Sequence, residues 1–407
     1  MLMKYILIIG DGMADHPIAK LGNLTPLQVA IKPNMDKITA KGRSGLIRTI
    51  PDGLKPGSDV AILSVLGYDP KEVYTGRGPF EAAARGIKLG KNDVAFRCNL
   101  ITENNGIISD YSAGHITSKE AKGLIQNLKK ILEKPDKIEF HSGLDYRNFL
   151  ILRNSPEAVL IESTPPHDAI GLKILEVMPK AKSKKAKKLV ENLKYIIINS
   201  REILESQPIN INRKKAGKNP GNMIWPWSGG KKPSLESFKK KYGLKAAVIS
   251  AVDLVKGIGI YSKMQIIIVP GATGLHDTNY EGKAHFAIQA LKNNDLVIIH
   301  VEAPDEAGHS KNYKQKIKTI EDLDKRLIGE IINKIDEPYA IAILSDHPTP
   351  CEIGTHTSEP VPFVIYSPFI KPDKITKFDE ITVKKGGFGL VVDKSIVSML
   401  IANKREK

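Results

Sequence analysis

Lys4-Tyr5-Ile6-Leu7-Ile8-Ile9-Gly10-Asp11-Gly12 is the stretch that decides the fold of this 407-residue chain. Its apolar run predicts a first strand at 4–9, too short and without the cleavage pattern of a signal peptide. The two glycines predict a sharp turn that presents Asp11 at the end of that strand. In open α/β folds, ligands bind at this edge of the sheet.

The rest of the chain repeats the same arrangement of strand followed by helix. The most continuous apolar strand is expected at 295–302, and a long helical pattern follows at 317–335. Further strands are expected at 44–49, 245–249, 265–269, 340–344 and 362–366. Strands that alternate with helices favour a mostly parallel, doubly wound α/β sheet.

A second pattern begins near residue 92, where several strands surround one helix. The strands are expected at 93–101, 106–110, 137–142 and 147–152, and the helix at 118–132. We expect a smaller α/β domain at 91–189, inserted into a catalytic domain of 1–90 and 190–407. A helix at 184–206 and a loop at 219–230 are expected to lead back into the main domain.

The composition indicates a soluble, cytoplasmic protein. The two cysteines are too few for a disulfide framework, and no apolar stretch is long enough to cross a bilayer. The net charge of +16 favours anionic ligands, either nucleic acid or a phosphorylated acid. The lysine runs, of which 180–188 is the longest, lack interleaved aromatics, so we interpret them as a solvated surface and expect no nucleic-acid partner.

Polar clusters follow several of the predicted strands and have the residue types of a two-metal site. Asp305 and His309 are spaced four residues apart, so one helical turn places them on the same face, and His356 follows in a later loop. We expect one metal ion on these three residues and a second on Asp11, Asp346 and His347. Two cations roughly 4 Å apart can hold a phosphoryl group between two oxygens. Carboxylate and imidazole ligands without thiolates suit Mn²⁺, Zn²⁺, Co²⁺ or Mg²⁺.

Ser58 is the candidate nucleophile, and its hydroxyl would also be a ligand of the second metal ion. A bound metal can hold a serine as the alkoxide, and the start of the helix expected at 58–66 favours a phosphoserine dianion. The alternative is an ordinary helix N-cap, which Ser58 followed by Asp59 would also satisfy.

The motifs, in this order, resemble the alkaline phosphatase superfamily and, within it, the archaeal-type branch of cofactor-independent phosphoglycerate mutase. The matching stretches are Ile-Ile-Gly-Asp-Gly-Met-Ala-Asp at 8–15, Thr-Gly-Arg-Gly-Pro-Phe-Glu-Ala at 75–82, Asp-Tyr-Ser-Ala-Gly-His at 110–115, Asn-Met-Ile-Trp-Pro-Trp at 222–227 and Glu-Ala-Pro-Asp-Glu-Ala-Gly-His at 302–309.

The resemblance implies an isomerase of glycolysis and gluconeogenesis that interconverts 3-phosphoglycerate and 2-phosphoglycerate without 2,3-bisphosphoglycerate. A phosphoserine at Ser58 would carry the phosphoryl group, two Mn²⁺-type ions would assist, and no organic cofactor is implied. The inserted domain would contact the substrate through His115, Arg97 and Arg147, with Lys283 on the main domain, because arginine suits carboxylate and phosphate. Closure of the two domains would exclude water.

The chain departs from the bacterial and plant branch of that family. Its insert is shorter, and Asp59 follows the nucleophile where that branch has Glu-Val-Gly. Three other activities within the superfamily stay open: a phosphohydrolase or sulfatase, a phosphopentomutase, and a kinase-like role toward homoserine, although the sequence has no P-loop. The metal used in the cell and the formation of a homo-oligomer are also left open by the sequence.

Overall fold

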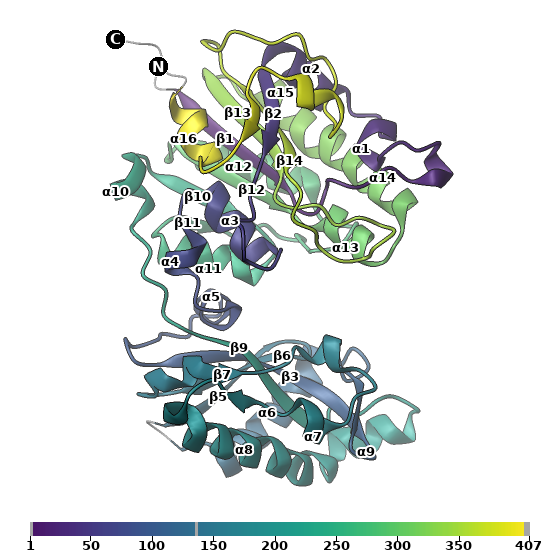
Figure 1. Cartoon of the computed structure of the whole chain (residues 1–407), viewed down its shortest axis with the longest axis vertical. Coiled ribbons are helices and arrows are strands. Elements are labelled where there is room, and N and C mark those ends of the chain that lie inside the picture. Colours follow the sequence, from purple (N-terminus) through teal and green to yellow (C-terminus); the bar gives the residue numbers. More distant parts are fainter. Residues whose placement is uncertain (1–2, 135–136, 403–407) are drawn as a thin grey trace. The chain divides into compact units, whose positions relative to one another are not determined.

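The structure is a computed structural model that describes residues 3–134 and 137–402 (Figure 1). The chain forms two compact units. Unit 1 runs up to Tyr74 and resumes at Leu235, and unit 2 spans Thr75–Ser234.

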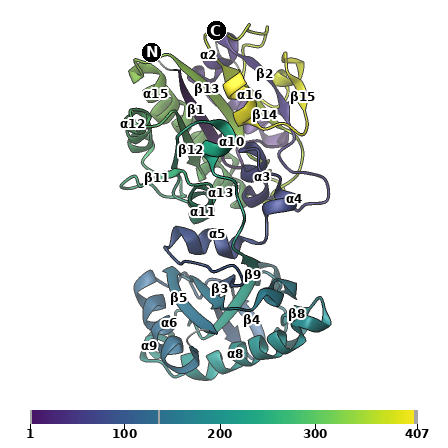
Figure 2. The same cartoon turned by 90° about the vertical axis from the view of Figure 1, so that its left-hand side faces the viewer.

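Unit 1 is built on an eight-stranded sheet of order β11-β10-β12-β1-β13-β14-β2-β15 (Figures 1 and 2). Its strands are β1 (Lys4–Gly10), β2 (Arg43–Ile47), β10 (Ala246–Ile249), β11 (Gln265–Ile267), β12 (Leu296–Val301), β13 (Tyr339–Ser345), β14 (Val361–Tyr366) and β15 (Gly389–Val391). The five neighbouring strands β11, β10, β12, β1 and β13 are parallel to one another. Strand β14 runs antiparallel to both of its neighbours, β13 and β2. The predicted mostly parallel α/β fold is therefore confirmed.

The register of the three central strands brings their carboxyl ends to one level. Gly10 at the end of β1 pairs with Val301 of β12 on one side and with Ser345 of β13 on the other. Because the strands are parallel, the residues that follow each of them leave the sheet at the same edge.

Helices cover both faces of this sheet. They are α1 (Pro26–Val29), α2 (Pro33–Lys41), α3 (Ser58–Val65), α4 (Pro70–Val73), α10 (Phe238–Tyr242), α11 (Asp253–Tyr261), α12 (Tyr280–Leu291), α13 (Ala303–His309), α14 (Tyr313–Asp322), α15 (Gly329–Lys334) and α16 (Ile396–Ala402). Ile6 and Ile8 of β1 lie in one buried core with residues of α2, α12, α14 and α15, while α16 contacts β1 and β13. The long helix predicted at 317–335 is interrupted by a π-helical segment at Leu323–Ile328.

Unit 2 contains a five-stranded antiparallel sheet of order β4-β3-β6-β5, with β9 paired to the other side of β3. Its strands are β3 (Val94–Asn104), β4 (Ile107–Asp110), β5 (Ile138–Leu144), β6 (Arg147–Leu152) and β9 (Met223–Lys231), with a separate pair, β7 (Ile161–Glu162) and β8 (Lys180–Ala181). Its helices are α5 (Arg77–Ala84), α6 (Ser118–Leu132), α7 (Ile174–Val177), α8 (Lys187–Glu205) and α9 (Pro208–Lys215).

The borders of the two units differ from the domain borders expected at 90/91 and 189/190. Helix α8 was expected on the return path to the main domain, but Val190, Leu193 and Ile197 bury their side chains in the core of unit 2. Strand β9, where we expected a loop, completes the sheet beside β3. The second border therefore lies at Ser234 rather than near residue 190, and the first at Tyr74.

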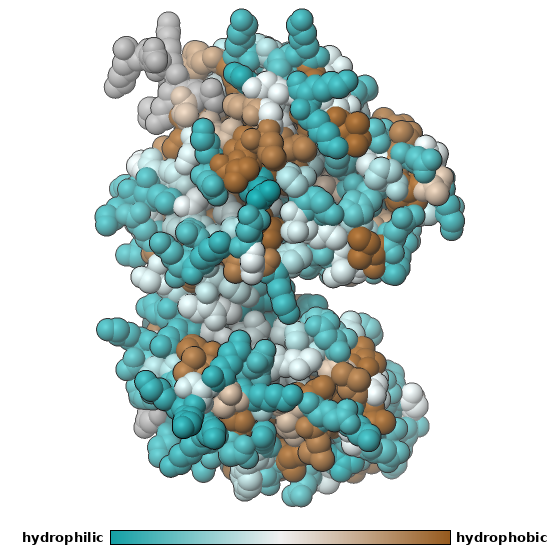
Figure 3. Space-filling model, in the orientation of Figure 1, coloured by the Kyte–Doolittle hydropathy of each residue, from teal (hydrophilic) through white to brown (hydrophobic). Residues whose placement is uncertain are grey.

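The outer surface of the chain is largely hydrophilic on the face that Figure 3 shows. Within the described residues, no helix combines the length and the apolar character that a membrane-spanning segment requires.

Candidate active site

The carboxyl edge of the unit 1 sheet collects the acidic and imidazole side chains singled out in the sequence. Asp11 follows β1, Asp346 and His347 follow β13, and Asp305 lies on α13 just after β12. All four are buried, with relative exposures of 0 to 4%. The long connection from β13 to β14 also supplies His356, so this edge holds the residues of both predicted metal groups.

Ser58 is the first residue of α3, and its hydroxyl points into this cluster. Its Oγ lies 3.1 Å from Nε2 of His347 and 3.3 and 3.4 Å from the two carboxylate oxygens of Asp11. The residue at the N-cap is Gly57, and no side chain caps the helix there. The alternative of an ordinary serine N-cap is therefore not what the structure shows.

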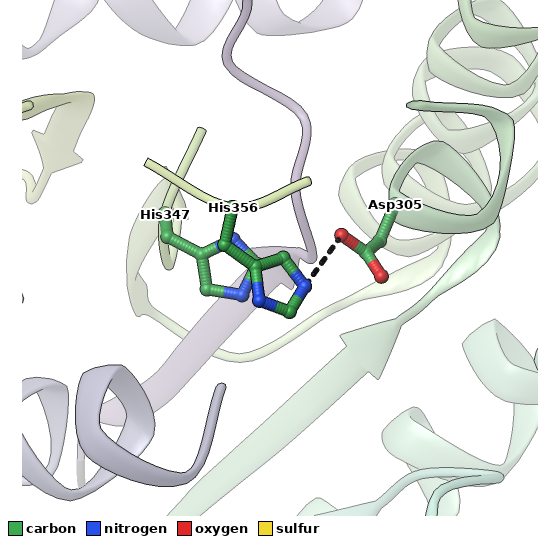
Figure 4. Close-up of side chains that lie close together, drawn as sticks. All are labelled: Asp305, His347 and His356. Carbon is green, nitrogen blue, oxygen red and sulfur yellow. Dashed lines mark ion pairs between the residues drawn. The ribbon is translucent and has the colours of Figure 1, made fainter. Parts of the chain in front are cut away.

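Asp305, His309 and His356 converge as the sequence predicts. Nε2 of His309 lies 3.2 Å from Oδ2 of Asp305, and Nε2 of His356 lies 3.5 Å from Oδ1. The two imidazole Nε2 atoms are 3.0 Å apart. Figure 4 shows the rings of His347 and His356 side by side, with Asp305 facing them.

The other predicted group, Asp11, Asp346 and His347, also has ligand atoms close enough to share one ion. Nε2 of His347 lies 3.5 Å from Oδ1 of Asp11 and 3.4 Å from Oδ2 of Asp346. A second set with this property joins Asp305 and His356 to His347, so His347 borders both groups. Gly12 makes this packing possible: it has φ +58°, a Cβ there would collide with Asp305, and its N–H donates to Oδ1 of Asp346.

The electrostatics of the cluster favour a cation. Burial, together with the negative charges of Asp346 and Asp305, raises the pKa of Asp11 well above its usual range. Oδ2 of Asp346 is buried and has no hydrogen-bond partner among the described residues. Burial alone would raise the pKa of Asp305, but hydrogen bonds from His309 and His356 lower it well below the usual range. Buried carboxylates of this kind are stabilised by metal coordination, so the residues fit divalent ions.

Beneath this cluster lie His300 and Lys283, both fully buried. Nε2 of His300 lies 2.9 Å from Oδ2 of Asp11, and its Nδ1 lies 3.3 Å from Oγ of Ser250. The ammonium of Lys283 donates to the carbonyl oxygen of His300 at 3.0 Å. Burial lowers the pKa of Lys283 to about 8, although Glu302 opposes this shift. The ammonium of Lys283 thus interacts with the carboxylate of Glu302 and with the backbone of His300.

Unit 2 contains a contrasting group of arginines and aromatic rings. Arg97 of β3 stacks on the cross-strand Trp227 of β9 at 4.3 Å and forms an ion pair with Glu81 at 3.1 Å. Burial, together with the positive charges of Arg77 and Arg147 and against the effect of Glu81, lowers the pKa of Arg97 to about 10. The positive charges of Arg77 and Arg147 thus both act on Arg97, which makes the group receptive to an anion.

The other aromatic residues of this group extend it along the sheet. Arg147 lies over the ring of Tyr146 at 4.9 Å, and Tyr146 contacts Tyr111 edge to face. The ring of His167 packs against both Tyr111 and Trp227. We call this set the arginine–aromatic group; its members are Arg77, Glu81, Arg97, Tyr111, Tyr146, Arg147, His167 and Trp227.

The structure brings together most, but not all, of the predicted site residues. Arg97 and Arg147 share one group, whereas His115 is exposed in the loop between β4 and α6, with φ +49°. Arg77, Trp227 and Thr349 were not among the site residues predicted from the sequence. Arg77 and Trp227 lie inside two of the quoted motifs, which was a usable signal. Thr349 carries no such signal, yet its hydroxyl donates to Oδ1 of Asp305.

These features define the class: an α/β protein with a buried carboxylate–imidazole centre, suited to divalent cations, around a serine at a helix N-terminus.

Comparisons with known proteins agree with this class and narrow it. Residues 39–210 match the family model of 2,3-bisphosphoglycerate-independent phosphoglycerate mutase, and residues 176–352 match that of type I phosphodiesterase / nucleotide pyrophosphatase. The 2,3-bisphosphoglycerate-independent phosphoglycerate mutase of Methanosarcina mazei is 50% identical over 404 residues, covering 98% of this chain and 100% of the relative. A probable enzyme of the same name from Geobacter sulfurreducens is 46% identical, covering 96% and 97%.

Solved structures give the same result for the fold. A protein from Pyrococcus horikoshii is 32% identical with a TM-score of 0.85, and both chains are covered fully. The cofactor-independent phosphoglycerate mutase from Thermoplasma acidophilum is 28% identical with a TM-score of 0.67, covering 98% of this chain and 99% of that one. The chain belongs to the 2,3-bisphosphoglycerate-independent phosphoglycerate mutase family, whose members are isomerases.

Proposed function

We propose that this protein interconverts 3-phosphoglycerate and 2-phosphoglycerate without 2,3-bisphosphoglycerate, with Ser58 as the phosphoryl carrier. Family membership supports the reaction. The observation that supports the carrier is the position of Ser58: a buried helix-terminal hydroxyl 3.1 Å from His347 and within 3.4 Å of Asp11. The same isomerisation serves glycolysis and gluconeogenesis.

The metal ligands of the proposal are those predicted from the sequence. Asp305, His309 and His356 would hold one divalent ion, and Asp11, Ser58, Asp346 and His347 the other, with Mn²⁺ as the first choice and Zn²⁺, Co²⁺ or Mg²⁺ as alternatives. Such ions, when bound, neutralise charge on phosphoryl oxygens and lower the pKa of a coordinated hydroxyl.

The residues of the chain then account for the transfer in two steps. In the first, Oγ of Ser58 gives up its proton and bonds to phosphorus, and the bond from phosphorus to the substrate oxygen breaks; that oxygen takes up a proton and leaves as a glycerate hydroxyl. In the second, the other hydroxyl of the bound glycerate gives up its proton and attacks the phosphoserine; the bond from Oγ to phosphorus breaks, and Oγ takes up a proton to regenerate the serine. The start of α3 suits the phosphoserine because unpaired N–H groups and the helix dipole favour a dianion.

Substrate contacts are assigned to the positive groups. Arg97 and Arg147, with Arg77 beside them, would bind the carboxylate or phosphate of phosphoglycerate, since guanidinium groups bind these anions in a bidentate manner. Lys283, predicted as a substrate contact, has a fully buried side chain that donates to the carbonyl oxygen of His300, so it would act on the substrate only through its charge. His115 remains a proposed substrate contact, although it is not a member of the arginine–aromatic group. Unit 2 would thus be the substrate-binding domain.

Phosphorus NMR of 3-phosphoglycerate with the protein and Mn²⁺ tests the function, with the metal removed before detection and no 2,3-bisphosphoglycerate added. We expect 2-phosphoglycerate with little free phosphate. Free phosphate alone would contradict the mutase and indicate a phosphatase, which the match of residues 176–352 to phosphodiesterases makes the main alternative. No change in the spectrum would contradict both.

A further inference from the structure

The strongest feature outside the assigned residues is a buried ion pair. It lies behind the buried cluster of Asp11, Asp305, Asp346 and His347, which we call the metal-type cluster. Lys316 of α14 and Asp15, which follows the Gly-Asp-Gly turn, both have fully buried side chains, and their charged atoms lie 2.8 Å apart. Neither residue has a role in the proposed chemistry. Buried charges of this kind are costly unless every donor is paired, so their contacts indicate what they do.

The ammonium group of Lys316 uses all three of its protons. It donates to Oδ2 of Asp15, to the carbonyl oxygen of Ala14 at 3.1 Å and to the carbonyl oxygen of Thr349 at 2.9 Å. Lysine has three donors and no acceptor, so this group is fully satisfied. One side chain therefore fastens the loop after β1 and the loop after β13 to the same helix.

Asp15 strengthens the same connection from its other side. Its carboxylate accepts the backbone N–H of His16 at 2.8 Å and that of Cys351 at 3.1 Å. The N–H of Thr349 also donates to the carbonyl oxygen of Ala14 at 3.2 Å. The segment 349–351 is thus held at both of its ends.

Thr349 transmits this position to the metal-type cluster. Its hydroxyl donates to Oδ1 of Asp305, the oxygen that faces His356, and it lies 3.3 Å from Nδ1 of His347. Gly308 of α13 lets the backbone of Thr349 approach closely, because a Cβ there would lie 2.3 Å from its carbonyl oxygen. A shift of Thr349 would therefore change or break its hydrogen bond to the carboxylate of Asp305.

We propose that Lys316, with Asp15, is a positioning residue that orients the carboxylate of Asp305 through Thr349 and so sets the affinity of the site for a divalent cation. The proposal rests on the cation-holding role proposed for Asp305. Groups that orient a metal ligand through a hydrogen bond change metal affinity by about 10- to 100-fold when they are removed.

Isothermal titration of the chelator-treated full-length protein with Mn²⁺ alone tests this, at a temperature where each variant is folded. Lys316→Met and Thr349→Val should each weaken Mn²⁺ binding about tenfold or more. Lys318→Met is the matched control, because Lys318 lies on the same helix with a 59% exposed side chain, and it should bind Mn²⁺ as the wild type does.

The double variant Lys316→Met/Thr349→Val distinguishes positioning from general stabilisation. If Lys316 acts through Thr349, the double variant should bind Mn²⁺ about as weakly as either single variant. Losses that multiply, or wild-type affinity in folded Lys316→Met, would overturn the proposal. Should Lys316→Met not fold, Lys316→Arg replaces it in the same cycle, since a planar guanidinium cannot place three N–H groups on the same oxygens.

The titration also separates this proposal from the proposed function, because no phosphoglycerate is involved. If the wild type binds Mn²⁺ but the losses of binding free energy in Lys316→Met and Thr349→Val add in the double variant, only the positioning role is refuted. A wild-type protein that binds no divalent cation would refute both this role and the proposed metal ligands.

Discussion

Unit 1 gathers three buried carboxylates at one edge of a parallel sheet, whereas unit 2 gathers three guanidinium groups on an antiparallel one. In unit 1, burial and the repulsion of neighbouring carboxylates raise the pKa of Asp11, and in unit 2, burial and the repulsion of neighbouring guanidinium groups lower the pKa of Arg97. Each group thus has an excess of one sign of charge: the first favours cations and the second favours an anion. Under the proposed function, the first group would hold metal ions and the second an anionic part of the phosphorylated acid, which would account for two such different groups in one chain.

The largest effect is expected from replacing the proposed nucleophile, because this change should abolish turnover in unit 1 without abolishing metal binding. Ser58→Ala should lower turnover about 10⁴-fold or more, because no other group can carry the phosphoryl. It should leave Mn²⁺ binding largely intact, since the carboxylates and imidazoles remain. Phosphorus NMR measures the turnover and calorimetry the binding. Comparable activity in the variant would remove Ser58 from the mechanism.

Removal of divalent cations should affect unit 1 selectively. Chelation should abolish activity, and added Mn²⁺ should restore it. At a free metal concentration 100 times the dissociation constant, one bound ion contributes about 2.7 kcal/mol to the free energy of unfolding. Amide hydrogen exchange should show the change around 11–15 and 346–356. A uniform change in hydrogen exchange over both units would contradict the assignment of cation binding to unit 1.

Arg97→Lys should weaken the anion group of unit 2 without altering metal affinity. Lysine keeps the charge but loses the planar fork and the stacking on Trp227, so we expect KM for 3-phosphoglycerate to rise about 10-fold or more. Arg85→Lys, an exposed position on the same unit, is the control and should leave KM unchanged. If both variants behave alike, the arginine–aromatic group is not the substrate site.

Glu380, which accepts hydrogen bonds from Asp15 and Thr25 near the unit 1 site, gives a test through the pH dependence of stability. Burial raises its pKa from 4.5 to about 7, although Thr25 and Asp15 donate hydrogen bonds to it. The folded state therefore keeps a proton that the unfolded state has lost, and the free energy of unfolding should fall by at most about 3 kcal/mol as pH rises from 4.5 to 7. Glu380→Gln should flatten this part of the stability curve in urea titrations. An unchanged slope would contradict the assignment.

The smallest effect is expected from the exposed lysines that give the chain its charge. Lys184, Lys185 and Lys188 lie on the surface of unit 2, and replacing all three with glutamate should change activity less than about twofold. The wild type should show no mobility shift with nucleic acid at low salt. A large loss of activity would mean that attraction of the substrate depends on the whole surface.

Much of unit 1 could be predicted because local signals and the fold agree. The strands that lead to Asp11, Asp305 and Asp346 are continuous apolar runs, and each is followed by one of the predicted metal ligands. In unit 2, the helix at 118–132 was predicted with its observed bounds, since Thr117 and Glu120 form a capping box that marks its start.

The remainder depends on contacts that sequence patterns do not specify. Pro226 and the glycines after it made β9 look like a loop, but β9 lies at an edge of its sheet, where proline is tolerated. The amphipathic face of α8 predicts a helix without telling which core buries it. Thr349 and Lys316 could not be singled out, because their contacts join segments more than 30 residues apart.

The reversed direction of β14 has a consequence for how this site can change over time. Because β14 runs antiparallel to β13, the chain between them, 346–360, begins and ends at the same edge of the sheet. That one connection carries Asp346 and His347 of one predicted ligand group and His356 of the other. A single insertion, deletion or cut within it would therefore disable both groups together, so the centre is expected to be gained or lost as a whole rather than one ion at a time.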